Sequence, residues 1–290
     1  MLGKMLKLSA SALGGLVLLA TATPAAAQWG GTCTRESLQE VADKYIEAQT
    51  QGVPLLLPMS REWFDYNENF KMATMSTGLL STPLKIDWHL IVLDATQCRF
   101  FVEAVALNPE NPYVFATQIS ATTAGAGNAS VVISEEHDWL FNAQNTYEYA
   151  RREDWSVIPE DKRNTREELL AAANAYLDLF KDKSTQVPWG TPCNRLEGGI
   201  YTGTGSPEDS CNVGVPENID MANRRYVVDE TIGAVSVFLD MGPSKRPDSH
   251  LFRVEDGKLR YVHTVTNCGT DVNCGFPPVD WSKQPKPPGV

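Results

Sequence analysis

A repeated segment is the feature that most constrains how this chain can fold. Residues 34–46 resemble residues 165–177 at a constant offset of 131 positions. The matched positions are Thr34-Arg35-Glu36 with Thr165-Arg166-Glu167, Leu38 with Leu169, Ala42 with Ala173, Tyr45 with Tyr176, and Ile46 with Leu177. Repetition at a fixed offset predicts one structural unit that is used twice.

Both copies predict the same capped amphipathic helix. Thr34 and Thr165 are typical N-cap residues, and acidic side chains follow in the first turn, where the helix dipole favours them. Leu38, Ala42 and Tyr45 fall at i, i+4 and i+7, which places them on one apolar stripe. We therefore expect two helices that each bury one face.

Segments rich in β-branched and aromatic residues follow each helix and predict strands. They cover residues 85–94, 99–107, 113–122, 130–134 and 139–149 in the first half, and 225–230, 234–240, 250–254 and 259–266 in the second. Glu255-Asp256-Gly257-Lys258 predicts a hairpin turn. Helices followed by antiparallel strands in each half predict an α+β fold.

The organisation of the chain follows from these elements. We predict a signal peptide at 1–27, a first domain at 28–153, a linker at 154–164, a second domain at 165–276 and a proline-rich tail at 277–290. The 36 acidic and 25 basic side chains give a formal net charge of −11. Such an acidic chain would repel a nucleic acid, so that partner is not expected.

The N-terminus predicts export. Lys4 and Lys7 precede an apolar stretch at residues 10–20, and the small residues 25–27 suit cleavage after Ala27. A membrane anchor is the alternative, but the apolar stretch is shorter than the ~20 residues that a spanning helix needs. We expect a secreted protein, extracellular or periplasmic, with no membrane association after cleavage.

Export permits disulfide bonds. Six cysteines follow the predicted cleavage point, and we favour pairing between sequence neighbours. The expected pairs are Cys193–Cys211 and Cys268–Cys274, which leave Cys33 with Cys98. A zinc site is the alternative, but the chain has no CxxC motif and its histidines do not lie near the cysteines in sequence.

Residues 188–199, 224–230 and 248–254 carry a family resemblance, with a weaker contribution from residues 83–87. They resemble the nuclear transport factor 2-like superfamily, most closely a group of secreted fungal proteins of uncharacterised function. The resemblance implies two cone folds in tandem, each with N-terminal helices on a bent antiparallel sheet. It also implies pairing of units through their sheets, as a homodimer or as an intrachain pseudo-dimer, and a pocket between helices and sheet.

Two histidines of the second half are candidates for proton transfer. His263 alternates with Tyr261 and Val265 on one face of a predicted strand, so it would enter the pocket if that face is concave. A satisfied core histidine is the alternative. His250 stands at the start of a predicted strand with Asp248 nearby, and a solvated position at the strand edge is its alternative.

Charged residues of the second half add further candidates. Asp229 and Glu230 end a strand beside a turn, and only one of two adjacent residues can face the pocket, while a solvated turn is the alternative. Arg195 could bind a carboxylate or an oxyanion with Glu197 orienting it, and a structural salt bridge is the alternative. Tyr201 could donate a hydrogen bond from the same region.

The first half offers two weaker candidate groups. Asp87 and His89 are two apart on a predicted strand, so they share a face as an acid–base pair or as a solvated pair. Trp63 and Tyr66 belong to an aromatic cluster that could stack on a ligand or pack in the core.

These features predict a secreted enzyme that transfers protons with histidine and carboxylate groups, without a metal or an organic cofactor. Members of the superfamily include isomerases, dehydratases, cyclases and lyases of lignin-derived phenylpropanoids. The resemblance therefore implies a small, aromatic, plant-derived substrate, such as a lignin-type aryl ether cleaved by hydrolysis or elimination. The alternatives are a non-catalytic extracellular ligand-binding protein and a secondary-metabolite cyclase or dehydratase, because a fold alone does not choose a function.

Overall fold

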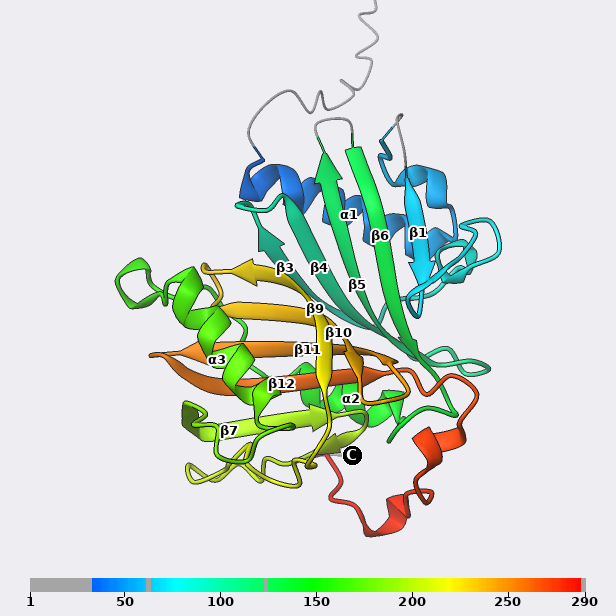
Figure 1. The fold of residues 1–290 in the computed structure, drawn as a ribbon. Helices are drawn as coiled ribbons and strands as arrows, with labels where there is room; N and C mark the ends of the chain where they lie inside the picture. The colour runs from blue at the N-terminus through cyan, green and yellow to red at the C-terminus, as the bar shows by residue number, and fades with distance from the viewer. Residues whose placement is uncertain (1–32, 61–63, 123–124, 288–290) are drawn as a thin grey trace, which may run out of the picture.

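The chain has the α+β architecture that its sequence predicts. The computed structural model describes residues 33–60, 64–122 and 125–287 and holds, within those ranges, two six-stranded mixed sheets and three α-helices (Figure 1). The predicted signal peptide lies outside these ranges. The sheets belong to the two halves of the chain.

Two of the helices form where the repeated segment predicts them. Helix α1 spans Arg35–Gln51 and helix α3 spans Arg166–Asp178. The Thr34 hydroxyl accepts a hydrogen bond from the third residue of α1, and the Thr165 hydroxyl does the same for α3. Both threonines therefore cap their helices as expected.

The two sheets share one strand order. Sheet A runs β2-β1-β6-β5-β4-β3, and sheet B runs β8-β7-β12-β11-β10-β9. The pairs β1–β6 and β7–β12 are parallel, and all other neighbouring strands are antiparallel. Sheet A is made of β1 (Asp65–Glu68), β2 (Lys71–Met72), β3 (Trp88–Asp94), β4 (Arg99–Ala106), β5 (Tyr113–Thr122) and β6 (Gly125–Ser134). Sheet B is made of β7 (Trp189–Glu197), β8 (Ile200–Tyr201), β9 (Met221–Asp229), β10 (Ala234–Met241), β11 (Arg246–Glu255) and β12 (Lys258–Thr266).

One predicted strand is wrong, and several strands were not predicted. Residues 139–149 contain helix α2 (Ala143–Ala150), because the Asn142 side chain caps the Asn145 amide at 2.9 Å and favourable helix formers follow. The sequence pattern does not predict the short strands β1, β2 and β8. It does not predict β7 either, because the Gly-Thr-Pro sequence near its start suggests a loop.

The predicted hairpin and the predicted disulfides are confirmed. Asp256 and Gly257 both have positive φ, 50° and 72°, as the tight turn between β11 and β12 requires. The disulfides join Cys33 to Cys98, Cys193 to Cys211 and Cys268 to Cys274. Such bonds are typical of oxidising compartments.

Among the described residues, no helix combines the length and the apolar character needed to cross a membrane.

Each sheet uses its two faces differently. We call α1 with sheet A the first unit, and α3 with sheet B the second unit. One face of each sheet packs on the unit's own helix, around Tyr45 in the first unit and Tyr176 in the second. The opposite faces pack against each other around Phe101 and Phe238, with the strands of the two sheets running crosswise (Figure 1). We call these the helix-facing side and the interface side.

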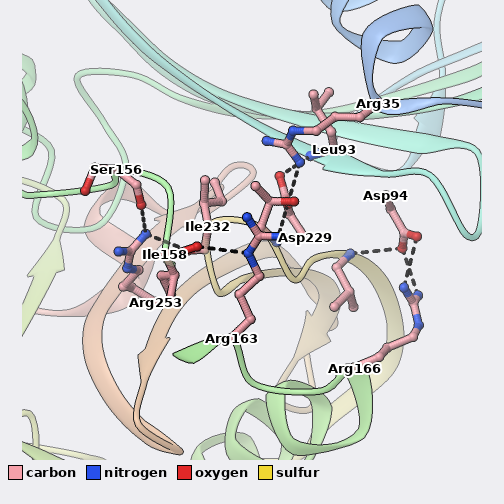
Figure 2. A network of polar contacts seen from close by, with 12 residues as sticks. Arg35, Leu93, Asp94, Ser156, Ile158, Arg163, Arg166, Asp229, Ile232 and Arg253 are labelled. Carbon is pink, nitrogen blue, oxygen red and sulfur yellow. Dashed lines mark hydrogen bonds and ion pairs between the residues drawn. The ribbon is translucent and has the colours of Figure 1, made fainter. Parts of the chain in front are cut away.

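Two reciprocal ion pairs fasten the interface (Figure 2). Arg166, the first residue of α3, makes a two-pronged pair with Asp94 at the end of β3, at 2.8 and 2.9 Å. Arg35, the first residue of α1, pairs with Asp229 at the end of β9 at 2.6 Å. Each unit thus supplies the cation for the other unit's carboxylate.

Main-chain amides complete the same reciprocal arrangement. Asp94 accepts the Val228 amide and Asp229 accepts the Leu93 amide, each at 3.0 Å across the interface. Both carboxylates are buried. A buried carboxylate with a cation and an amide donor is compensated, whereas one deprived of its cation is strongly destabilising.

The predicted linker lies against the second unit. Arg253 donates to the carbonyls of Ser156 at 2.9 Å and Ile232 at 2.6 Å, and Arg163 donates to the Ile158 carbonyl at 2.9 Å (Figure 2). These bonds hold residues 156–163 beside β10 and β11.

Replacement of Arg166 should show how much the reciprocal pairs contribute. We expect Arg166→Gln to lower the free energy of unfolding by about 3–5 kcal/mol, because it leaves Asp94 buried and unpaired. Lys44→Gln is the control, since the Lys44–Glu47 pair is exposed and its loss should cost less than about 0.5 kcal/mol. Denaturant titration measures both values, and equal small losses would contradict this role of the interface.

Candidate active site

A cavity of about 110 Å³ lies on the helix-facing side of sheet B, and we call it the chamber. Tyr176 and Phe180 wall it from the α3 side, and Trp139 and Phe276 line it with ring centroids 4.4 Å apart. Phe276 is half-exposed, so this pair stands at the mouth. An apolar cavity of about 150 Å³ holds benzene. The chamber therefore suits a group close to one small ring in size.

Strand β11 brings an acid and a histidine to the chamber. Asp248 and His250 are two residues apart, so strand alternation puts both on the helix-facing side. Nδ1 of His250 lies 2.5 Å from one carboxylate oxygen of Asp248, and the Thr266 hydroxyl donates to the other at 2.6 Å. An ionised Asp248 accepts from Nδ1–H, and this tautomer leaves the lone pair on Nε2.

The Nε2 atom of His250 is buried without a hydrogen-bond partner among the described residues. The side chain is 2% exposed and is surrounded by the rings of Tyr176, Phe180 and Phe252, with centroids 5.7, 6.1 and 5.8 Å away. An unsatisfied buried polar atom costs about 1–3 kcal/mol. A role in chemistry or in ligand binding is one explanation for such an atom.

Strand β7 adds a cation to the chamber wall. Arg195 forms an ion pair with Glu197 at 3.1 Å, and the Trp139 indole N–H donates to Glu197 at 2.9 Å. The Nε atom of Arg195 is buried and, within the described part of the chain, has no hydrogen-bond partner. Burial lowers the pKa of Arg195, but Tyr176 and Glu197 raise it by more, so the guanidinium stays charged.

Tyr176 supplies a neutral phenol. Burial raises the pKa of Tyr176 to about 12, so its hydroxyl keeps its proton at neutral pH. The chamber thus combines an imidazole lone pair, a fixed positive charge and a protonated hydroxyl among aromatic rings. These are the components of general acid–base chemistry with stabilisation of a developing anion.

The corresponding region of the first unit, on the helix-facing side of sheet A, lacks the acid–histidine pair and the arginine. Strand registers align the two sheets residue by residue. Phe115 stands in the place of Asp248, Thr117 in that of His250, Ile133 in that of Thr266, Tyr66 in that of Arg195, and Glu68 in that of Glu197.

The first unit's polar groups are satisfied internally. The Tyr45 and Thr117 hydroxyls bond to each other at 2.7 Å, and the Tyr66 hydroxyl donates to Glu68 at 2.7 Å. Phe115 fills the volume beside them. One repeat therefore has a packed core where the other has an acid–histidine pair, so the pair is not a requirement of the fold.

His263 lies on the interface side of sheet B and does not enter the chamber. Its Nδ1 is 2.7 Å from Glu103 of β4, and its Nε2 is 2.5 Å from Glu153, which follows α2. Burial lowers the pKa of His263, but Glu153 and Glu103 outweigh it and raise the pKa to about 10. His263 is therefore a buried cation that joins the units, and at neutral pH it has no lone pair for a substrate.

The other second-half candidates lie apart from the chamber. Asp229 is held by Arg35 at the interface, and Glu230 is exposed and accepts the Arg166 amide at 3.1 Å. Tyr201 donates to Glu153 at 2.9 Å and stacks on Tyr149. Of the predicted group, the structure brings together His250, Arg195 and Glu197.

The first-half candidates that the structure describes do not come together in one site. Asp87 accepts from Lys85 at 2.6 Å and from the Leu107 amide at 2.8 Å, and it does not pair with the exposed His89. Tyr66 is buried in the first unit's core. Trp63 lies outside the described residues.

The sequence pattern indicates Asp248 only as a neighbour of His250, and it does not indicate Tyr176 or Thr266 as site residues. The predicted strand began at residue 250, whereas β11 begins at Arg246. A strand that begins at Arg246 places Asp248 and His250 on the same face, because they are two residues apart. Within the part of the chain that the structure describes, no three histidine, cysteine or acidic side chains gather as a metal-binding group.

Comparison with known proteins adds one finding. Residues 162–266 match the sequence model of a family described as a domain of unknown function, DUF8021. The search of curated proteins found no match. The matched range spans α3 and sheet B, so it contains the chamber's Asp248, His250, Arg195 and Glu197.

The charge on His263 predicts how stability changes with pH. The folded-state pKa of about 10 lies above the ordinary value of 6.5, so the stabilisation is complete below pH 6.5 and disappears as the pH rises through 10. We expect Glu103→Gln to lower the folded-state pKa and to shift this decline to lower pH. Denaturant titrations between pH 6 and 10 measure it, with His89→Gln as the exposed control; coincident profiles for Glu103→Gln and wild type would contradict the assignment.

Proposed function

We propose that this protein is an enzyme in which His250 transfers a proton to or from a small substrate in the chamber. The observation that carries the proposal is the buried Asp248–His250 pair, whose Nε2 has no partner among the described residues. A histidine that serves only structure is expected to be bonded at both nitrogens, as His263 is.

The roles follow from the contacts. Asp248 holds Nδ1–H, so Nε2 takes the substrate proton, and the resulting imidazolium is stabilised by the same carboxylate. The protonated Nε2 then returns the proton to a leaving group or to the product. Arg195, oriented by Glu197, stabilises negative charge that develops on a substrate oxygen. Tyr176 remains protonated and is a hydrogen-bond donor.

The size and lining of the chamber limit which substrates can bind. A volume of about 110 Å³ with aromatic walls favours one ring or a similarly small apolar group that carries a carbonyl or ether oxygen. A two-ring aryl ether would leave its second ring at the mouth, beside Trp139 and Phe276. Hydrolysis or elimination of a lignin-type aryl ether therefore stays one form of the proposal.

Secretion is part of the same proposal. Three disulfides in a chain that begins with an export-like segment are typical of proteins that work outside the cytosol. A substrate found outside the cell fits this location. The two-cone superfamily assignment also belongs here: a helix packed on a six-stranded mixed sheet in each unit supports it.

Proton transfer can be measured before the natural substrate is known. We expect the protein to catalyse deuterium exchange in D₂O, or bond cleavage, for some members of a panel of one-ring ketones, esters and aryl ethers, followed by NMR. Two-ring β-O-4 ethers, assayed for released phenol, test the lignin form. His250→Gln should reduce the rate by about 10²–10⁴.

The matched control is His89→Gln, which removes an exposed histidine far from the chamber wall and should leave the rate unchanged. Asp248→Asn should lower the rate as well, because it disturbs the tautomer of His250. Ligand binding without exchange or cleavage, unaffected by His250→Gln, would contradict catalysis and identify a binding protein.

A further inference from the structure

A second cavity lies between the two units, and it is built very differently. It measures about 370 Å³ and is lined from the interface side of sheet A and from β9 of sheet B. We call it the interface cleft. Its charged lining residues are Arg99 and Arg225, and its other polar lining residues are Asn67, Gln118, Ser120, Asn128 and Ser130.

The cleft is open because the repeat is imperfect. Strand registers place Ser130 of sheet A in the position that His263 holds in sheet B. His263 is covered by Glu153 and by Trp155, whose ring lies 5.5 Å away, and both belong to the segment after α2. Helix α2 follows β6, and the corresponding chain after β12 forms, within the described residues, only the short 3₁₀ helices Val272–Gly275 and Trp281–Lys283, so no equivalent helix covers Ser130.

The two arginines lack a direct acidic partner among the described residues. Neither guanidinium forms an ion pair with an acidic side chain of the described residues, and Nη2 of Arg225 is buried without a hydrogen-bond partner there. The charge of Asp240 raises the pKa of Arg225 without an ion pair between them, and the same carboxylate accepts a hydrogen bond from the Asn223 amide at 2.6 Å.

The environment of Arg225 disfavours its positive charge. Burial lowers the pKa of Arg225, and the nearby charge of Arg99 lowers it further. Phe70 holds the Arg225 guanidinium in place, 4.2 Å from the centre of its ring. A positioned, partly desolvated guanidinium with free N–H groups is the usual receptor for a carboxylate or a phosphate.

We infer that the interface cleft binds a small organic acid that also carries several hydroxyl groups, such as a uronic acid. Arg99 and Arg225 would bind the carboxylate, and the asparagine and serine side chains would bind the hydroxyls, since amides and hydroxyls both donate and accept. The Gln118 amide nitrogen already donates to the Arg225 carbonyl at 3.0 Å and to Ser236 at 3.1 Å, so only its carbonyl oxygen would accept from the ligand. This site is separate from the chamber, because it uses the interface side of sheet A.

Calorimetry with the whole protein tests this inference. Galacturonate is the probe, galactose is the neutral analogue of the same shape, and inorganic phosphate is the simple anion. We expect galacturonate to bind more tightly than either. Arg99→Gln and Arg225→Gln should each weaken it by about tenfold or more, the equivalent of one charge-assisted hydrogen bond.

Arg260→Gln is the matched control, because Arg260 also has a buried nitrogen without a partner among the described residues but lies outside the cleft. His250→Gln should bind galacturonate normally, which separates this site from the proposed catalytic one. Circular dichroism verifies that each variant is folded. Galacturonate should raise the unfolding temperature of the wild type, Arg260→Gln and His250→Gln, and raise that of the Arg99→Gln and Arg225→Gln variants less. No binding, equal binding of galactose or phosphate, or binding that survives both arginine replacements would overturn the inference.

Discussion

The structure depends on the reciprocal pairing of each unit's aspartate with the other unit's first helical arginine. Asp94 and Asp229 are buried, and each is neutralised by a side chain that its own unit does not supply. The exchange commits one face of each sheet to the interface. A buried carboxylate without its cation is strongly destabilising, so neither unit is complete alone. The chamber lies on the helix-facing side of sheet B, whereas His263, on the interface side, serves as a bridging cation.

The two units share this architecture but differ on the helix-facing sides of their sheets. The first unit fills its helix-facing side with Phe115 and with the bonded hydroxyls of Tyr45 and Thr117. The second places Asp248 and His250 at the corresponding positions and leaves Nε2 without a partner among the described residues. We interpret the first unit as support for the second, because fully satisfied polar groups stabilise a core while unsatisfied ones weaken it.

Much of the fold could be predicted from the sequence, because its signals are local. Thr34 and Thr165 mark helix starts, Asp256-Gly257 marks a turn, and cysteine spacing gave the disulfides. The site was harder, because alternation says which residues share a face but not what covers that face. His263 and His250 both alternate correctly, yet Glu103 lies 160 positions from His263, and no local pattern could reveal it. The ion pair of Asp229 could not be predicted for the same reason, since its partner Arg35 lies in the other half.

The central claim is that one buried histidine is free for chemistry while the other is held as a structural cation. Nitrogen-15 NMR of the imidazole rings tests this most directly, because ring nitrogen shifts and couplings report which atoms carry protons. We predict that at pH 8 His263 carries protons on both ring nitrogens, as its pKa of about 10 requires. His250 should hold a proton on Nδ1, toward Asp248, and its Nε2 signal should shift when a one-ring ligand binds. A neutral His263, or a His250 ring protonated on Nε2 alone, would contradict the account.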